Sequence, residues 1–341
     1  MGGAGTYMNE LYKYHTEDEG FVFMNLYDPF GDYRANGFLD QQDILIMHRD
    51  EHEKLKNIEC DIFVIQFYEL AFCLTDDVIR NKKIVYVVHS VPTPEPPPLY
   101  DPFGGNDDVR MKFERVCDVA SVIVCVSEAE KRKLVEIFPR YADKIRVVYN
   151  GMTFNKKVLL NKNYKKSRKV FGYIGRADYR KGILECIREF RNLDCELRIA
   201  CPKNDETYIK NILDYVEAAS MKDRVKFYGW CVGERKENFL NALDALIIPS
   251  LYEPFGYVAL EGMQYGLPII TSNNGGLDEI FSGYKYKYNP YKRGELKNLI
   301  LEFQNDTNEE IMMQQTIMMN NMNRFTSEEM VKNYRGIWDA I

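Results

Sequence analysis

Short runs of β-branched and aromatic residues alternate with longer amphipathic segments along most of the chain. A buried parallel strand reads as a nearly continuous apolar run, whereas a covering helix is apolar on one face only. The pattern therefore predicts a doubly wound α/β fold with parallel sheets. In the first half of the chain, the strands are expected at residues 21–27, 43–48, 60–68, 83–90, 121–127 and 144–151.

Two amphipathic segments of the first half illustrate the helices that connect these strands. They cover residues 107–120 and 127–138. The second should begin at an N-cap, Ser127, whose hydroxyl can accept from the backbone three residues later. Glu130 stands at the distance that a capping box requires. Local sequence therefore defines where this helix starts.

The alternation pauses over residues 152–169 and then restarts, so the chain divides into two halves of similar size. Its 341 residues are about twice the usual size of one domain. We predict a first domain over residues 1–165, a second over 166–324 and a final helix within 325–341. The strands of the second domain are expected at residues 169–175, 197–201, 225–230, 245–250 and 267–272.

The segment between the two halves is strongly basic. The stretch NKKVLLNKNYKKSRK, residues 155–169, holds seven lysines and arginines. Such a run is typical of a solvated linker. Contact with lipid headgroups or with an acceptor is the functional alternative.

Composition excludes several classes of protein. The net charge of −6 argues against nucleic acid as the main partner. No apolar run approaches the length of a membrane span, and the first ten residues lack the features of a secretory signal. The eight cysteines form no C-x-x-C pair, which favours buried reduced thiols. We therefore expect a soluble, cytoplasmic protein.

The first strand of the second half leads into a segment with two cations. The sequence GRADYRKG, residues 175–182, places Arg176 and Lys181 five positions apart between a strand and a helix. Ligands of such folds bind beyond the carboxyl ends of the strands, where helix N-termini also favour anions. The pair therefore predicts a diphosphate site.

The strand at residues 245–250 leads into a segment with two carboxylates, EPFGYVALE. Glu253 precedes a turn in which the amides of Phe255, Gly256 and Tyr257 can donate to hydroxyls or phosphate. Glu261 follows about two helical turns later. A buried carboxylate without partners would be costly, so both should bind ligand hydroxyls. We expect one glutamate to bind a hexose and the other to bind a ribose diol.

The ordered set of motifs resembles the retaining glycosyltransferases of family 4, which have the GT-B fold. The motifs are GGAGTY, VSEAEKRKL, VVYNG, GRADYRKG, EPFGYVALE and GLPIITSNNGGLDEI, and they span essentially the whole chain. The resemblance implies two Rossmann-like, doubly wound domains that face a cleft. It also implies that the final helix crosses back to the first domain.

The resemblance assigns roles to individual residues. Arg176 and Lys181 would hold the nucleotide diphosphate, and Glu261 would hold the ribose. Glu253 and the amides of residues 255–257 would hold the donor sugar. His89 would lie at the reactive face of the sugar, and its alternative role is that of a satisfied histidine at the end of a strand.

The glycines at the start of the chain would form a loop near the phosphates and the acceptor. A side chain at Gly2 or Gly3 would block that approach. Members of the family have a central hydrophobic strand before this loop, whereas the present sequence starts at the loop. The first domain is therefore expected to lack its first strand.

The implied activity is metal-independent transfer of a hexose-type sugar, with retention, from a nucleotide diphosphate sugar to a hydroxyl acceptor. UDP and GDP sugars stay open as donors, and no other cofactor is expected. The acceptor could be a glycan, a lipid-linked sugar or a small molecule. A lipid-linked acceptor would place the protein at the inner face of a membrane. The alternatives are a GT-B phosphorylase, a sucrose-type synthase or a catalytically degenerate protein that binds nucleotide sugars.

Overall fold

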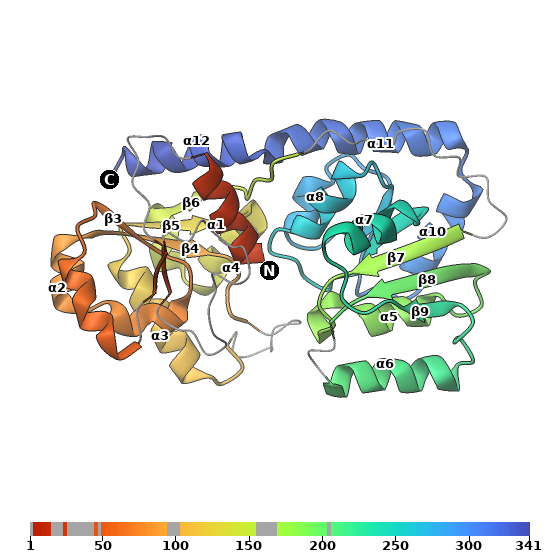
Figure 1. Cartoon of the computed structure of the whole chain (residues 1–341), viewed down its shortest axis with the longest axis horizontal. Coiled ribbons are helices and arrows are strands. Elements are labelled where there is room, and N and C mark those ends of the chain that lie inside the picture. Colours follow the sequence, from red (N-terminus) through yellow and green to blue (C-terminus); the bar gives the residue numbers. More distant parts are fainter. Residues whose placement is uncertain are drawn as a thin grey trace. The chain divides into compact units, whose positions relative to one another are not determined.

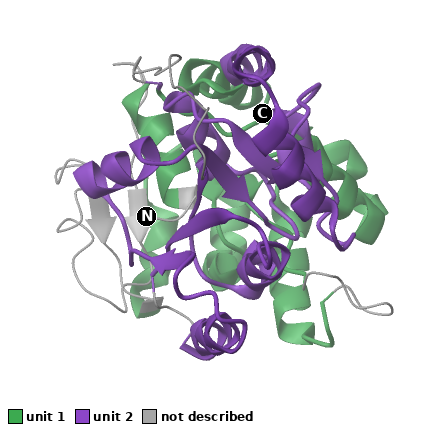
Figure 2. Cartoon of the chain, turned by 90° about the vertical axis from the view of Figure 1, so that its right-hand side faces the viewer, with its two compact units in different colours: residues 1–153, 325–341 green, residues 154–324 purple. Residues whose placement is uncertain are grey.

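The computed structural model describes residues 3–14, 23–25, 44–46, 49–93, 103–154, 169–202 and 206–341. The chain forms two compact units: unit 1 contains residues 1–153 and 325–341, and unit 2 contains residues 154–324 (Figure 2). The chain thus passes from one unit to the other after Thr153 and again after Arg324. The boundary expected at residue 165, and most of the basic stretch, lie outside the described residues.

The described residues of unit 1 form two parallel sheets. The larger sheet has four strands in the order β3-β4-β5-β6, so neighbours in sequence are also neighbours in space. The smaller sheet pairs β1 with β2, and within the described ranges no strand joins it to the larger sheet. The strands are β1 (Phe23–Asn25), β2 (Ile44–Ile46), β3 (Ile62–Ile65), β4 (Lys83–Val88), β5 (Val122–Cys125) and β6 (Ile145–Val147).

Helices connect the strands of unit 1 and bury its core. Asn106 caps α3 by accepting from the amide of Val109, and Ser127 caps α4 by accepting from the amide of Glu130. The fully buried ring of Phe113, in α3, lies among other aromatic rings of this core. The α-helices of the unit are α1 (Gly3–Lys13), α2 (Asp76–Asn81), α3 (Asp107–Val119), α4 (Glu128–Ile137) and α12 (Ser327–Trp338), and its 3-10 helices include η2 (Arg49–Asn57), η3 (Tyr68–Cys73) and η4 (Pro139–Lys144).

The last helix, α12, packs on the first helix of the same unit (Figure 1). Thr326 caps α12 by accepting from the amide of Glu329 at 3.3 Å. Met330 and Tyr334 are buried, and the ring of Tyr334 lies 5.5 Å from that of Tyr7 in α1. The amphipathic stripe of the tail is therefore used for packing within unit 1.

Unit 2 contains one six-stranded parallel sheet with the order β12-β11-β10-β7-β8-β9. Sequence order runs outward in both directions from the β7–β10 pair, so this pair is the topological switch point. The two-residue strand β12 was not anticipated, because it is too short to give a periodic signal. The strands are β7 (Lys169–Ile174), β8 (Cys195–Ala200), β9 (Val225–Phe227), β10 (Ala245–Ile248), β11 (Ile269–Ser272) and β12 (Lys287–Tyr288).

Helices cover both faces of the sheet in unit 2. Figure 1 shows α5 and α6 on one side of β7 and β8, and α7 and α8 on the other. This arrangement confirms the predicted doubly wound fold. The helices are α5 (Ile183–Glu189), α6 (Glu206–Ala218), α7 (Gly233–Asn241), α8 (Tyr257–Gln264), α9 (Gly276–Ile280), α10 (Glu295–Asn305) and α11 (Asn308–Met322), with the 3-10 helices η5 (Tyr179–Lys181) and, at the boundary, η6 (Asn323–Phe325).

Candidate functional site

The switch point of unit 2 brings together the two segments for which ligands were predicted. The first segment follows β7 and the second follows β10, and both leave the same edge of the sheet. The amide of Leu251 donates to the carbonyl of Arg180 at 2.8 Å. Gly182 has φ +64°, and a Cβ there would lie 2.2 Å from the carbonyl oxygen of Pro249. Only a glycine therefore allows the two segments to approach this closely.

Lys181 and Glu253 form an ion pair at this junction. The ammonium Nζ lies 2.5 Å from Oε2, and the side chains are 18% and 13% exposed. The hydroxyl of Ser250 donates to the same carboxylate oxygen at 3.2 Å. The structure thus places a cation and a carboxylate side by side where sequence analysis expected a diphosphate and a sugar.

The backbone of Glu253 is held by the glycines that follow β11. Its carbonyl accepts from the amide of Gly276 at 2.8 Å. Gly275 has φ +72°, and a Cβ at this position would lie 2.2 Å from the carbonyl oxygen of Glu253. The NGG sequence of the family motif therefore allows three segments at the switch point to meet without side chains between their backbones.

Helix α8 starts directly after this junction. Its N-cap is Gly256, which has φ +112° and no side chain with which to cap the first turn. The buried ring of Phe255 lies 5.4 Å from the ring of Tyr257 in an edge-on arrangement. Glu261 lies in the second turn of the helix. The residues expected to bind the sugar and the ribose of the donor therefore lie on one continuous segment.

Glu261 is paired with a residue that sequence analysis did not identify. The ammonium of Lys236, in α7, lies 2.6 Å from its Oε2, and the side chains are 26% and 29% exposed. These two residues are far apart in sequence and lie on different helices. No local spacing could therefore have indicated the contact.

Arg176 lies beyond the end of β7 and is 59% exposed. Its guanidinium lies 3.5 Å from Asp178 Oδ2, and its carbonyl accepts from the hydroxyl of Tyr173 at 2.5 Å. The two predicted phosphate-binding cations therefore have different partners: Lys181 contacts a site carboxylate, whereas Arg176 contacts a neighbour in its own turn.

The remaining predicted residues belong to unit 1. His89 follows β4, and its Nε2 lies 2.6 Å from Gln66 Oε1. The ring of Tyr7 lies 5.2 Å away in an edge-on arrangement, and burial lowers the pKa of His89 to about 4. The imidazole is therefore neutral near pH 7. Gly3 is the first residue of α1, and Gly2 lies outside the described residues.

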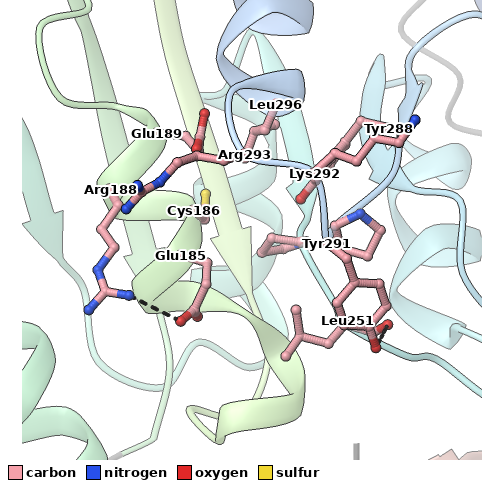
Figure 3. Close-up of a pocket in the computed structure, with 12 residues that line it drawn as sticks. Glu185, Cys186, Arg188, Glu189, Leu251, Tyr288, Tyr291, Lys292, Arg293 and Leu296 are labelled. Carbon is pink, nitrogen blue, oxygen red and sulfur yellow. Dashed lines mark hydrogen bonds and ion pairs between the residues drawn. The ribbon is translucent and has the colours of Figure 1, made fainter. Parts of the chain in front are cut away.

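A cavity of about 160 Å³ lies between α5 and the segment that leads from β12 to α10 (Figure 3). None of the predicted site residues lines it. Two contacts within the protein hold side chains of its wall: Arg188 pairs with Glu185 at 3.4 Å, and Glu189 accepts from the amide of Gly294 at 3.1 Å, whereas Oε2 of Glu185 is buried without a hydrogen-bond partner among the described residues.

Two further features of the described part of the chain bear on function. It contains no group of three or more His, Cys, Asp or Glu residues placed to hold a metal ion. Within the same part of the chain, none of the helices has both the length and the hydropathy required to cross a membrane.

Two family models match the chain one after the other. The model described as Glycosyltransferase Family 4 matches residues 1–155, and the model described as Glycosyl transferases group 1 matches residues 156–317. Together they span nearly all of the sequence, and the change from one to the other lies within two residues of the boundary between the compact units.

Curated relatives have related descriptions. An uncharacterized glycosyltransferase of Methanocaldococcus jannaschii is 30% identical over 177 residues, which are 46% of this chain and 44% of the relative. A glycogen synthase of Mycobacterium tuberculosis is 29% identical over 164 residues, 47% of this chain and 39% of the relative. A probable sucrose-phosphate synthase of Thermosipho melanesiensis is 26% identical over 66% of this chain and 56% of the relative. The chain thus spans less than half the length of the first two relatives.

Solved structures resemble the whole chain. The Anabaena protein HepE, in complex with UDP and glucose, superposes with a TM-score of 0.81 at 18% identity and covers 100% of this chain and 96% of its own. The lipopolysaccharide outer core galactosyltransferase WaaB superposes with a TM-score of 0.74 at 17% identity, covering 100% and 97%. At these identities the similarity shows the fold.

Proposed function

The chain belongs to the family 4 and group 1 glycosyltransferases, and on this premise we propose that it transfers a hexose-type sugar from a nucleotide diphosphate sugar to a hydroxyl acceptor. The anomeric configuration is retained in the proposed reaction, and no metal ion takes part. The donor is a UDP or GDP sugar. The HepE structures, which contain UDP, UDP with glucose or UDP-glucose, support a donor of the UDP type.

The observation that carries the proposal is the junction at the switch point. Strand β7 delivers Lys181 and strand β10 delivers Glu253 to the same place, and the helix after β10 carries Glu261. Doubly wound folds bind ligands in this position. A nucleotide sugar requires a cation for its diphosphate and acceptors for its hydroxyl groups, and the junction supplies both.

In the proposed step, the bond between the anomeric carbon and the phosphate oxygen breaks. The acceptor oxygen forms the new bond on the same face, and the proton of its hydroxyl passes to an oxygen of the departing diphosphate. Negative charge therefore develops on the leaving group, where Lys181 and Arg176 stabilise it. Backbone amides of Phe255, Gly256 and Tyr257 complete the donor site.

Two groups would contact the reacting sugar. Glu253 accepts hydrogen bonds from its hydroxyls, and His89 lies at its reactive face, as the resemblance implies. Because burial lowers the pKa of His89 to about 4, the imidazole acts there as a neutral hydrogen-bonding group. In the proposed site, Gly2 and Gly3 would let the backbone approach the phosphates and the acceptor closely, because they have no side chains.

The proposed acceptor is a glycan, a lipid-linked sugar or a small molecule. A lipid-linked acceptor would place the enzyme at the cytoplasmic face of a membrane, with the basic stretch 155–169 on anionic headgroups. A sucrose-type synthase, with a sugar phosphate as acceptor, is the second candidate. The relative described as a probable sucrose-phosphate synthase supports it.

Thermal stabilisation by a panel of UDP and GDP sugars tests the donor. A ligand at 100 times its Kd should add roughly 2.7 kcal/mol to the free energy of unfolding. The donor that stabilises the protein is then incubated without an acceptor, and hydrolysis is followed by NMR of the anomeric proton. Release of the sugar with its original configuration, in the presence of EDTA, supports a retaining, metal-independent transferase.

The same assay separates the alternatives. Stabilisation without hydrolysis, and without transfer to any acceptor in a panel of sugars and sugar phosphates, would identify a degenerate binding protein. Strong stimulation by a sugar phosphate would favour the synthase. If no UDP or GDP sugar stabilises the protein, the proposed function is wrong.

A further inference from the structure

The ion pair between Lys236 and Glu261 joins two helices that start at the same edge of the sheet. Helix α7 starts directly after the loop that follows β9, and α8 starts after the loop that follows β10. Lys236 lies in the first turn of α7, and its Nζ contacts Oε2 of Glu261 at 2.6 Å. The pair therefore lies on the ligand-binding side of a doubly wound sheet.

The position of Lys236 matches the chemistry of a nucleoside. The loop before α7 exposes the side chains of Tyr228, Trp230 and Val232, which offer an apolar surface for a planar base. Glu261, on α8, is the proposed ligand of the ribose. Base and ribose are separated by one covalent bond, so the elements that bind them must be held together. Lys236 makes this connection directly.

A second carboxylate lies in the surroundings of Glu261. Burial and the negative charges of Glu237 and Glu261 raise the pKa of Tyr265, so a second carboxylate lies near the same phenol as Glu261. The ammonium of Lys236, 2.6 Å from Oε2, attracts the carboxylate of Glu261. It also fixes one oxygen of Glu261, which leaves Oε1 to accept from a diol.

We propose that Lys236 is a positioning residue for ribose recognition: it orients Glu261 toward the ribose hydroxyls of the nucleotide donor. The inference rests on the proposed function, because Glu261 needs a ribose to bind. The ammonium of Lys236 pairs with the carboxylate of Glu261, so its proposed effect on the ligand passes through Glu261.

Equilibrium binding to the full chain tests the inference, with UDP and GDP each compared with its 2′-deoxy form. The wild type should prefer the ribonucleotide by about tenfold or more, since one hydrogen bond to a charged group is lost in the deoxy form. Lys236→Met should weaken the ribonucleotide by about threefold to tenfold and leave the deoxynucleotide within about twofold. Lys236→Arg should retain most of the preference.

Two further variants distinguish this role from general stabilisation. In the background of Glu261→Gln, Lys236→Met should cause no additional loss. Lys222 pairs with Glu217 at the same distance of 2.6 Å, but it precedes β9 and so lies at the opposite edge of the sheet. Lys222→Met should therefore leave both affinities unchanged.

The outcomes separate the inference from its premise. If the wild type binds neither UDP nor GDP, the proposed function fails and the inference fails with it. If the wild type binds and prefers the ribonucleotide, the premise stands. Three results for Lys236→Met would then overturn the positioning role of Lys236. They are unchanged binding of the ribonucleotide, equal losses for the ribonucleotide and the deoxynucleotide, and a full additional loss in the Glu261→Gln background.

Discussion

Lys181 and Glu253 are 2.5 Å apart and largely buried, although the proposed donor site gives them different ligands. The ammonium should bind the diphosphate, whereas the carboxylate should bind sugar hydroxyls. In this structure each side chain thus neutralises the other. When a diphosphate attracts Lys181, the acceptor sites of Glu253 become available to the sugar, so the two binding events should be coupled.

The variant Glu253→Gln tests this coupling. Glutamine keeps the size of the side chain and removes the charge that attracts Lys181. We expect UDP or GDP alone to bind about threefold to tenfold more tightly, because the ammonium no longer has to leave an ion pair. The nucleotide sugar should bind more weakly and turn over more slowly.

Glu261→Gln is the matched control for that experiment. It should weaken the free nucleotide and the nucleotide sugar together, because the ribose is common to both. Isothermal titration with both ligands measures the difference. Equal losses for both ligands in both glutamate variants would contradict the proposed division between sugar and ribose.

Lys181→Ala should remove a charge-assisted contact to the diphosphate. Such contacts contribute roughly 1.5–3 kcal/mol, so the affinity for the donor should fall by about one to two decades. The variant should also melt at a lower temperature, because Glu253 loses the partner of a largely buried carboxylate. If Lys181→Ala bound the donor as tightly as the wild type, Lys181 would not belong to the donor site.

Local features of the fold could be predicted from sequence because their partners are close in the chain. The N-cap of α4 is an example, since Ser127 accepts from the amide of Glu130 as expected. The carboxylate of Glu130 could not be foreseen: it accepts from the amide of Val91, 39 positions away. That contact depends on how the helix lies against the chain beyond β4.

In the candidate site, too, some residues could be predicted from sequence, whereas contacts between distant segments could not. Lys181 and Glu253 can be predicted from sequence because each follows a strand, and the strand order explains why they meet. Lys236 was missed, because only the packing of α7 near α8 brings it to Glu261. The strand expected at 225–230 ends at Phe227, since the residues after it form the exposed loop before α7.

The stability of the protein should depend on His89 between about pH 6.5 and pH 4. Burial lowers the pKa of this imidazole to about 4, and its described neighbours Gln66, Tyr7 and Phe67 carry no charge. The unfolded chain therefore binds a proton that the folded chain does not. The contribution is fully present above pH 6.5 and is lost as the pH falls, with a slope of at most about 1.4 kcal/mol per pH unit.

Urea denaturation of the wild type and of His89→Gln across this pH range measures that contribution. Glutamine does not titrate, so the difference between the two free energies of unfolding should change as the pH falls from 6.5 to 4. A difference that is constant over the range would show that the imidazole is not held neutral in the folded protein.

The last prediction concerns Glu10, whose carboxylate joins three segments of unit 1. The side chain of this α1 residue is nearly inaccessible, and Oε2 accepts from the amide of Thr153 at 3.0 Å and from the hydroxyl of Ser327 at 2.7 Å. Thr153 is the last residue before the chain leaves the unit, and Ser327 begins α12. Glu10 thus fastens the start of α12 and the end of the first segment to α1.

Glu10→Ala should lower the free energy of unfolding by about 1–3 kcal/mol for each buried donor that it leaves unpaired. Hydrogen exchange should increase at Thr153 and in the first turn of α12. Lys13→Ala is the control: Lys13 also pairs with Glu10 at 2.6 Å, but it is 46% exposed, so its loss should cost about 1 kcal/mol or less. Equal destabilisation by the two variants would contradict the proposed role.

Acid titration gives a second test of the same network. Burial opposes ionisation of Glu10, but hydrogen bonds from Lys13, Thr153 and Ser327 lower its pKa below the ordinary value. The stability that this carboxylate contributes is therefore present above the pKa of the unfolded chain and is lost as the pH falls through the lower folded value. Glu10→Gln should reduce this loss relative to the wild type.

Deletion of residues 325–341 should destabilise unit 1 at every pH, because it removes α12 from α1 together with the hydroxyl of Ser327.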